Sequence, residues 1–346
     1  MIERACIRML LICVLSFPMG VASAQDDVVN RYLNVYPVGD SPILRLISPA
    51  VSEETILFEA KPIVRYSFYN NIYQRLRDNH PTGQAIFLSY RPHFRMYTDN
   101  SRPVKMPSSR IGLAFQFVQR SDSDNLRTLS IEHGHYSNGQ SGCTFLEGAE
   151  DGSTACDSVY ATLAADSDLS KLLNRRNGDF STNFTKVLLN WRLNRLDDAR
   201  PDSILSITLG WEWYHNPLLI IFDIGGYDPR DIGIYGRHRL SLQAEYERPG
   251  RSFPIVRWIP LLRALPRASL LGSYERILAA DDRVNANRVV GQFTGYIGRI
   301  GIALGFVYGH DDYNIRLVDS SLQAYIGVTW KIFPSFNLRQ QDFPDF

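Results

Sequence analysis

Apolar and polar residues alternate with a period of two along many segments of this sequence, and this alternation limits the folds that the chain can adopt. Between residues 321 and 332, for example, the even-numbered residues are Leu, Ala, Ile, Val, Trp and Ile. Residues two apart lie on the same face of a strand, so each such segment predicts a strand with one apolar face. The other segments of this kind are 55–70, 85–97, 109–119, 127–137, 181–193, 203–215, 235–247, 267–277, 287–297 and 299–309.

The length of these segments favours a membrane over water as the solvent outside the sheet. The strands of a soluble β-sandwich also alternate between apolar and polar residues, but they are usually about five or six residues long. Many of the segments here reach ten residues or more, the length that a tilted strand needs to cross a bilayer. Aromatic residues near strand ends, as in the interfacial girdles of barrels, include Tyr90, Trp211, Trp213, Tyr246, Tyr308 and Trp330.

The pattern therefore predicts an all-β protein, a transmembrane antiparallel β-barrel with long extracellular loops. Eleven strands can be placed, and because bacterial barrels of one chain have even strand numbers, twelve are expected. The barrel domain is expected to fill residues 25–346, with 25–54 as a periplasmic segment before the first strand. If the C-terminus lies on the periplasmic side, the strand that ends near Asn138 runs outward. Residues 139–178 are then expected to form a long extracellular loop.

The first 24 residues have the three parts of a secretory signal peptide. Arg4 and Arg8 are basic, Met9 to Phe17 is apolar, and Ala22-Ser23-Ala24 is a small-residue cleavage signal. No uninterrupted run of about 18 apolar residues follows, so a membrane span must be built from strands. Export by a signal peptide together with a barrel predicts a location in the bacterial outer membrane.

Charge and cysteine content narrow the remaining possibilities. The formal net charge is +1, which gives no electrostatic footprint for a nucleic-acid partner. Cys143 and Cys156 are the only cysteines outside the predicted signal peptide, and both lie in the predicted extracellular loop. Because exported proteins meet an oxidising compartment, this pair predicts a loop disulfide.

The residues that carry chemistry lie at the outer end of the predicted strand 127–137, in His135-Tyr136-Ser137-Asn138-Gly139. The apolar members of one face of this strand mark it as the lipid side, which places His135 and Ser137 toward the bilayer. A histidine and a serine are costly against hydrocarbon unless they serve a function. That face consists of Leu129, Ile131, His133, His135 and Ser137.

Two residues apart on one face, His135 can accept the proton of the Ser137 hydroxyl, as in the activated nucleophile of acyl transfer. A neutral imidazole in the correct orientation needs a third group on its other nitrogen. Asn183 lies near the loop end of the next predicted strand, at the height of His135 if the two strands pair. An asparagine carbonyl can accept the imidazole N–H, so the three residues form a candidate triad.

These residues resemble the outer-membrane phospholipase A family, whose barrels carry a His-x-Ser-Asn-Gly motif on one strand and Ser-x-Asn on the next. The resemblance implies that His135 is the general base, Ser137 the nucleophile and Asn183 the orienting residue. It also implies hydrolysis of acyl esters of membrane phospholipids, of the phospholipase A1 or A2 type, by an active homodimer that uses calcium. Gln140 and Asp179 stand where the family has its calcium ligands, although the loop between the two motif halves is longer than is usual there.

Other functions are also compatible with parts of the pattern. A lipid A deacylase has a similar His-x-Ser-Asn motif, but on a smaller barrel and with a glutamate as third member. A porin or another structural barrel would have no catalytic residues. His133 and His135 share one face and could bind a metal ion, but a third ligand is not evident. Asp311 and Asp312 are expected in a solvated extracellular turn.

Overall fold

The computed structural model describes most of the predicted barrel domain. The predicted signal peptide lies outside the described residues. The described ranges are 41–48, 56–78, 80–98, 104–121, 125–197, 200–216, 225–253, 265–298, 300–318 and 321–330.

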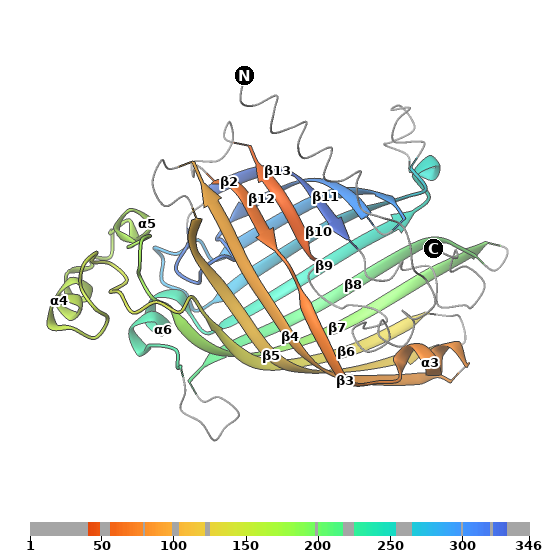
Figure 1. Cartoon of the computed structure of the whole chain (residues 1–346), viewed down its shortest axis with the longest axis horizontal. Coiled ribbons are helices and arrows are strands. Elements are labelled where there is room, and N and C mark those ends of the chain that lie inside the picture. The colour runs from red at the N-terminus through yellow and green to blue at the C-terminus, as the bar shows by residue number, and fades with distance from the viewer. Residues whose placement is uncertain are drawn as a thin grey trace.

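The strands form one antiparallel sheet that closes into a barrel (Figure 1). β2 and β3 both pair with β4, which makes them two halves of one interrupted strand and gives a closed barrel of twelve strands. The closure is completed by β1, which pairs with β13 on one side and with β2 on the other. The strands are β1 (Ile43–Ile47), β2 (Ile56–Lys61), β3 (Val64–Asn70), β4 (Thr82–Tyr97), β5 (Val104–Arg120), β6 (Leu126–Ser137), β7 (Ser181–Asp197), β8 (Arg200–His215), β9 (His238–Arg248), β10 (Arg267–Leu278), β11 (Asn287–Ile297), β12 (Ile300–Gly309) and β13 (Ser321–Trp330).

The two ends of the barrel differ. One end carries the connection from β6 to β7 with α4 (Thr154–Thr162) and α5 (Leu169–Leu172), and also α6 (Pro229–Tyr235) (Figure 1). We call this the loop end. The opposite end carries α3 (Ile72–Arg77), and a 3-10 turn (Gly250–Ser252) follows β9. None of the helices in the described ranges combines the length and the apolar character needed to cross a membrane.

The twelfth strand lies where the sequence pattern predicted none. β1 falls inside 25–54, which was expected to be a periplasmic segment, and it is nevertheless part of the barrel wall. Ile43 and Ile47 point inward and Leu44 and Leu46 outward, so both faces are apolar apart from Arg45. A five-residue strand with two apolar faces has no period-two signal, and only its pairing with β13 and β2 makes it a strand.

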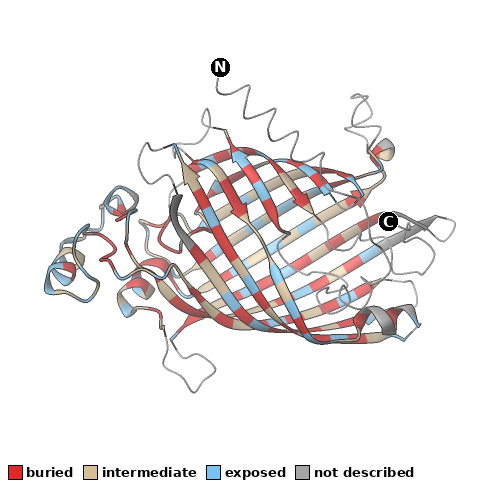
Figure 2. Cartoon of the chain, in the orientation of Figure 1, coloured by how far each residue is buried: buried red, intermediate tan, exposed pale blue. Residues whose placement is uncertain are grey.

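The outer wall of the barrel is apolar and the lumen is polar. Exposed and buried residues alternate along the strands in Figure 2. On β9, Leu240 and Leu242 are exposed while Arg239 is buried, as the alternation predicted. On β12, Ile302 and Leu304 are exposed. An outward apolar band around a polar interior is the arrangement of a transmembrane barrel, in agreement with the predicted fold class.

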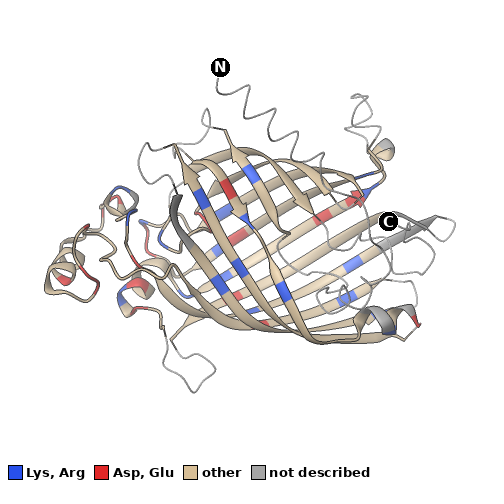
Figure 3. Cartoon of the chain, in the orientation of Figure 1, with Lys and Arg blue, Asp and Glu red and all other residues tan. Residues whose placement is uncertain are grey.

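Both signs of charge occur on the strands (Figure 3), and many of these groups form ion pairs inside the lumen. Glu59 on β2 is completely buried and contacts Arg45, Arg95 at 2.7 Å and His93 at 2.6 Å. Asp311, expected in a solvated turn, instead pairs with the Arg95 guanidinium at 2.6 Å. Because β1, β2 and β4 contribute Arg45, Glu59 and Arg95, the cluster lies where the barrel closes.

The loop end is packed rather than open. Cys143 and Cys156 form the predicted disulfide, with an S–S distance of 2.08 Å. The β6–β7 connection contributes Phe145 and Leu169 to a buried apolar cluster that also contains Tyr235, from the end of α6, and Leu317, from the β12–β13 connection. Residues from distant parts of the sequence therefore hold the long loops together above the barrel.

Candidate active site

His135 and Ser137 occupy the last positions of the outer face of β6, at the loop end of the barrel. Both side chains are partly exposed, whereas the intervening Tyr136 is buried in the lumen at 1% exposure. The hydroxyl of Tyr136 donates to the backbone carbonyl of Tyr313 at 3.0 Å. The wall that carries the histidine and the serine is thus fixed from inside by the β12–β13 connection.

The register of β6 with β7 places Asn183 directly opposite His135. His135 Nδ1 and Asn183 Oδ1 are 2.9 Å apart, which is a hydrogen-bond distance. Asn183 has no exposed surface, so this contact is shielded from solvent. Pairing of the two strands across the long connection therefore brings together the two residues that the sequence placed at the same height.

A second contact of Asn183 decides how this hydrogen bond is oriented. Asn183 Nδ2 donates to the backbone carbonyl of Asn216, which directly follows β8. A carbonyl can only accept, so the amide nitrogen must face Asn216 and the amide oxygen must face His135. His135 Nδ1 then carries the proton, and its Nε2 lone pair is left to act as a base.

Ser137 shares the outer face with His135, and its neighbours across the two adjacent strands are Ser109 and Ser181. Among the described residues, no hydrogen bond joins the Ser137 hydroxyl to His135. Residues two apart on a strand are separated by about 7 Å at Cα, so rotation of the two side chains controls their contact. Catalytic hydrogen bonds are often long before substrate binds.

The chain that follows β8 covers the histidine from outside the barrel wall. A Cβ atom on Gly225 would lie 2.5 Å from His135 Cε1 and 3.1 Å from Ser181 Oγ, so only glycine fits here without displacing the imidazole. Gly225 also has a φ of +57°, which favours glycine independently. Sequence reasoning missed Asn216 and Gly225, because Gly225-Gly226 indicates a turn but not which wall that turn touches.

A second histidine pair lies beside the candidate triad. His133 Nδ1 and His215 Nε2 contact the Thr185 hydroxyl at 2.9 Å and 3.0 Å, and the two imidazole rings stack with centroids 5.3 Å apart. His133 therefore contacts Thr185 and His215 rather than sharing a ligand with His135. In the described part of the chain, the only group of three potential metal-binding side chains is Glu59, His93 and Asp312, which lies in the lumen among arginine and lysine side chains.

Asp179, one of the two residues expected to bind calcium, lies just before β7. Its Oδ1 atom is buried and accepts no hydrogen bond from the described residues, but it forms an ion pair with Arg316 Nη1 at 3.6 Å. Burial raises the pKa of Asp179 to about 6. Gln140, the other expected residue, follows the motif and is partly exposed, and its backbone N–H donates to Asn138 at 3.3 Å.

Asn138 joins these two regions. Its side-chain Nδ2 donates to the carbonyl of Gly178 at 2.8 Å, and its Oδ1 accepts from the N–H of Phe180 at 3.1 Å. The motif asparagine therefore connects the chain before Gln140 to both neighbours of Asp179. A carboxylate oxygen that accepts no hydrogen bond in such a fixed loop fits a hard cation, whereas the Arg316 guanidinium paired with it weakens that fit by repulsion.

Comparison with known proteins gives solved structures only. No family model matches the sequence, and neither does any curated protein. The outer membrane phospholipase A of Escherichia coli is similar at 10% identity and a TM-score of 0.49, over 86% of this chain and 95% of that chain. The outer membrane phospholipase dimer of Salmonella typhi, solved with bound calcium, is similar at 9% identity and a TM-score of 0.48, over 85% of this chain and 92% of that chain.

LpxR from Salmonella typhimurium is also similar, at 8% identity and a TM-score of 0.34, over 84% of this chain and 99% of that chain. Identities and TM-scores in this range carry no functional conclusion.

Proposed function

We propose that this protein is a calcium-dependent outer-membrane phospholipase that hydrolyses acyl esters of phospholipids with Ser137, His135 and Asn183. The observation that carries the proposal is the 2.9 Å contact of His135 Nδ1 with Asn183 Oδ1 on the outer wall. A buried amide that fixes the tautomer of an imidazole prepares that imidazole to act as a base towards a neighbouring serine. The wall of a passive barrel has no need of such a contact. The site lies at the loop end of the outer wall, where the ester groups of the lipid would meet it.

The reaction proposed is acyl transfer to serine followed by hydrolysis. His135 Nε2 takes the Ser137 proton as the serine oxygen attacks the ester carbonyl, and the imidazolium then protonates the departing lysophospholipid alcohol. A water molecule, deprotonated by the same imidazole, attacks the acyl-serine and releases the fatty acid. Asn183 stays neutral throughout and holds the ring through its amide oxygen.

Asp179, with the backbone carbonyl of Gln140, would hold calcium beside this site. Its buried Oδ1 atom accepts no hydrogen bond from the described residues, although it is ion-paired with Arg316, and the Asn138 contacts fix the chain on both sides. When bound, calcium supplies positive charge for the oxyanion that develops on the ester. We expect Arg316 to lower the affinity compared with a site made of carboxylates alone, because its guanidinium lies 3.6 Å from Asp179 Oδ1.

An outer-membrane location makes the outer-leaflet side of the bilayer the place of reaction, since the site lies at the loop end. Two copies that meet through their lipid-facing walls would cover both sites, which is compatible with an active homodimer. A signal peptide at residues 1–24 would direct the export that this location requires.

A passive pore is disfavoured by the lumen. One cavity in the lumen measures about 260 Å³, and ion pairs such as Lys61–Asp312 at 2.6 Å lie among the residues that line it. A porin of wide bore has a water-filled channel instead. Among the described residues, these lumenal ion pairs therefore count against a wide water-filled channel.

Substrate comparison tests the proposed activity directly. Purified barrel in detergent should release fatty acid from a diacyl phospholipid in the presence of calcium, and should release much less from lipid A. Mass spectrometry of the products distinguishes hydrolysis of the phospholipid from hydrolysis of lipid A. Release of fatty acid from lipid A alone would indicate a lipid A deacylase instead of a phospholipase. Release from neither substrate would contradict both activities.

Asn183→Ala should lower kcat for phospholipid roughly 10²-fold, at the low end of what general acid–base catalysis contributes, because the imidazole loses its orientation. Asn183→Asp keeps an acceptor oxygen and should retain more activity than the alanine variant. Thr185→Ala is the matched control on the same strand and face, since Thr185 contacts His133 instead of His135. Equal activity of Asn183→Ala and Thr185→Ala would show that Asn183 does not position the base.

Calcium binding should depend on pH through Asp179. Because burial raises the pKa of Asp179 to about 6, protons should compete with calcium as pH falls through that value. Isothermal titration at pH 8 and pH 5 should show weaker binding at pH 5. Asp179→Asn should weaken binding at pH 8 by about tenfold or more, which corresponds to about 1.4 kcal/mol. Asp166→Asn, an exposed carboxylate of the same loop, should bind as the wild type does; identical affinities in all three proteins would exclude Asp179 as a ligand.

A further inference from the structure

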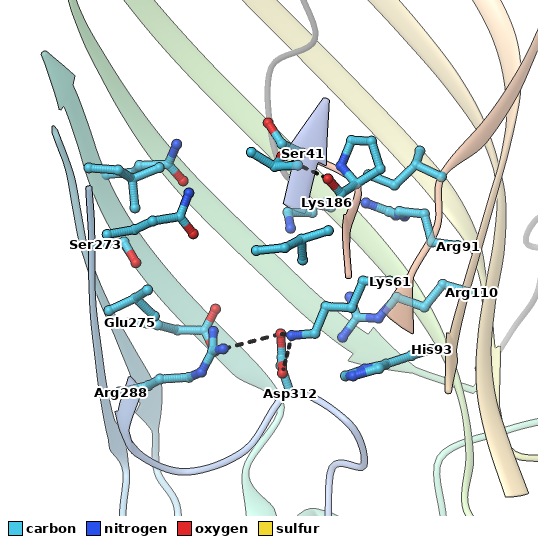
Figure 4. A pocket seen from close by; sticks show the side chains of 18 of the residues that line it. Ser41, Lys61, Arg91, His93, Arg110, Lys186, Ser273, Glu275, Arg288 and Asp312 are labelled. Carbon is cyan, nitrogen blue, oxygen red and sulfur yellow. Dashed lines mark hydrogen bonds and ion pairs between the residues drawn. The ribbon is translucent and has the colours of Figure 1, made fainter. Parts of the chain in front are cut away.

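Charged side chains of the described strands are mostly buried or partly buried. In Figure 4, Glu275 and Arg288 face the lumenal cavity, and Arg288 pairs with Asp312 at 3.1 Å. Among the strand residues whose burial is described, the charged side chains that are exposed are Arg127 and Arg276. Arg127 is the second residue of β6, at the end opposite the loops, whereas Arg276 lies two residues before the loop end of β10.

Arg276 lies on the lipid-facing side of β10. Tyr274 and Leu270, which share this face of the strand, are exposed, and so is Leu240 directly across the β9–β10 pair. No hydrogen bond or ion pair joins the Arg276 side chain to another residue in the described ranges. A cation on this side of a barrel is unfavourable unless an anion accompanies it, so the position calls for a negatively charged group from outside the chain.

A second hydrogen-bond donor lies beside Arg276. Asn287, the first residue of β11, is directly opposite Arg276 and is also exposed. Opposite residues of antiparallel strands have Cβ atoms about 4.5–5.5 Å apart, so the two side chains can bind one group. The Tyr274 hydroxyl donates to Asn287 Oδ1 at 2.6 Å, which turns the amide nitrogen of Asn287 away from the tyrosine.

The wall beside these two donors becomes apolar with distance from the loop end. Leu242 and Val289 lie opposite Tyr274 on the two neighbouring strands, and both are exposed. Leu270 continues this apolar surface along β10. Arginine N–H groups match the oxygens of a phosphate, and exposed leucine and valine match acyl chains. Donors next to an apolar surface therefore fit a membrane lipid, whereas a free anion would use the donors only.

The charge on this part of the wall favours an anionic lipid over a zwitterionic one. The outward faces of β9, β10 and β11 carry no carboxylate in their described residues, and Arg276 is a cation among them. The phosphate of a zwitterionic headgroup could meet Arg276, but the cationic part of that headgroup would find no counter-charge here. A headgroup with a net negative charge has no such mismatch.

We propose that Arg276 and Asn287 bind the phosphate of an anionic membrane lipid on the outer wall, at a site distinct from Ser137. Three strands, β7, β8 and β9, separate β10 from β6. At roughly 4.8 Å per strand, about 19 Å of wall lies between the two sites. The lipid is therefore held on the wall rather than presented to the proposed nucleophile, and its headgroup fixes the level of the loop end in the bilayer. This site depends on the barrel and not on the proposed hydrolysis.

Mass spectrometry of the intact full-length barrel, released from detergent, counts bound lipids and tests this site. All proteins in the experiment carry Ser137→Ala, so that hydrolysis of the probe cannot be mistaken for a failure to bind. Phosphatidylglycerol should bind at lower concentration than phosphatidylcholine. Arg276→Gln should weaken binding of phosphatidylglycerol about tenfold, the usual effect of losing a charge-assisted hydrogen bond. Arg276→Lys keeps the charge but loses the planar fork and should weaken it less, and Asn287→Ala should also weaken it.

Lys171→Gln is the matched control, because it removes a cation at the same end of the barrel, from α5, where the Lys171 side chain is 83% exposed. This variant should bind phosphatidylglycerol as its parent does. Inorganic phosphate at the concentration of the lipid should not displace it, and displacement would overturn the assignment to a lipid. Equal affinity of the parent and Arg276→Gln for phosphatidylglycerol would overturn the site, and equal binding of the two lipids by the parent would overturn its preference for an anionic headgroup.

Discussion

Replacement of Ser137 by alanine should reduce release of fatty acid from phospholipid by at least about 10³-fold, down to the level of the buffer control. The hydroxyl is the proposed nucleophile, so the proposed reaction cannot begin without it. His135 and Asn183 would keep their 2.9 Å contact, because that contact does not involve the serine. The loss should appear in kcat, since truncation of a small partly exposed side chain leaves the lipid-binding wall intact.

Ser109→Ala is the matched control for this variant. Ser109 lies opposite Ser137 on β5, is also partly exposed, and has no part in the proposed reaction. Circular dichroism and the shift of electrophoretic mobility on heating would establish that both variants are folded barrels. Equal hydrolysis by Ser137→Ala and the wild type would contradict the mechanism, even if His135 were still required.

Replacement of Glu59 by glutamine should lower the free energy of unfolding by about 3–5 kcal/mol, the usual result of removing one partner from a buried ion pair. Glu59 has no exposed surface, and Arg45, His93 and Arg95 converge on it. Without the carboxylate, two guanidinium groups would face each other in the lumen. Since these residues join β1, β2 and β4, the variant should mainly weaken the strand pairing that closes the barrel.

Urea unfolding and refolding in detergent, followed by tryptophan fluorescence, measures this loss. Glu147→Gln is the matched control, because Glu147 also pairs with an arginine, Arg176, but both side chains are more than half exposed. Exposed pairs contribute about 0–1 kcal/mol, so the control should unfold close to the wild type. Equal midpoints for the two variants would mean that the Glu59 cluster does not hold the closure.

Much of the wall could be predicted from the sequence alone. The eleven alternating segments correspond to strands, and 127–137 and 181–193 coincide closely with β6 (Leu126–Ser137) and with the first part of β7 (Ser181–Asp197). Period-two alternation is a local property, because an apolar residue faces lipid whatever its partner strand is. The Cys143–Cys156 disulfide was also predictable, since only two cysteines remain after the predicted signal peptide.

Elements that depend on partners were harder to predict. β1 has apolar residues on both faces and becomes a strand only between β13 and β2. Asp311 and Asp312 have the sequence of a polar turn, but they fold inward onto Arg95 and Lys61, more than 200 residues away in the chain. A local pattern carries no information about which distant cation will neutralise a carboxylate.

By itself the sequence determined that this chain has a lipid-facing wall and that His135 and Ser137 share it. Residues two apart on a strand point to the same face, and this follows from backbone geometry alone. It also placed Asn183 on the same face of the next predicted strand. Only the tertiary structure decided that His135 and Asn183 are in register, that Asn216 fixes the amide, and that Gly225 covers the imidazole. These contacts join strands and loops that are separated by tens of residues, and such contacts are set by how the barrel closes and packs.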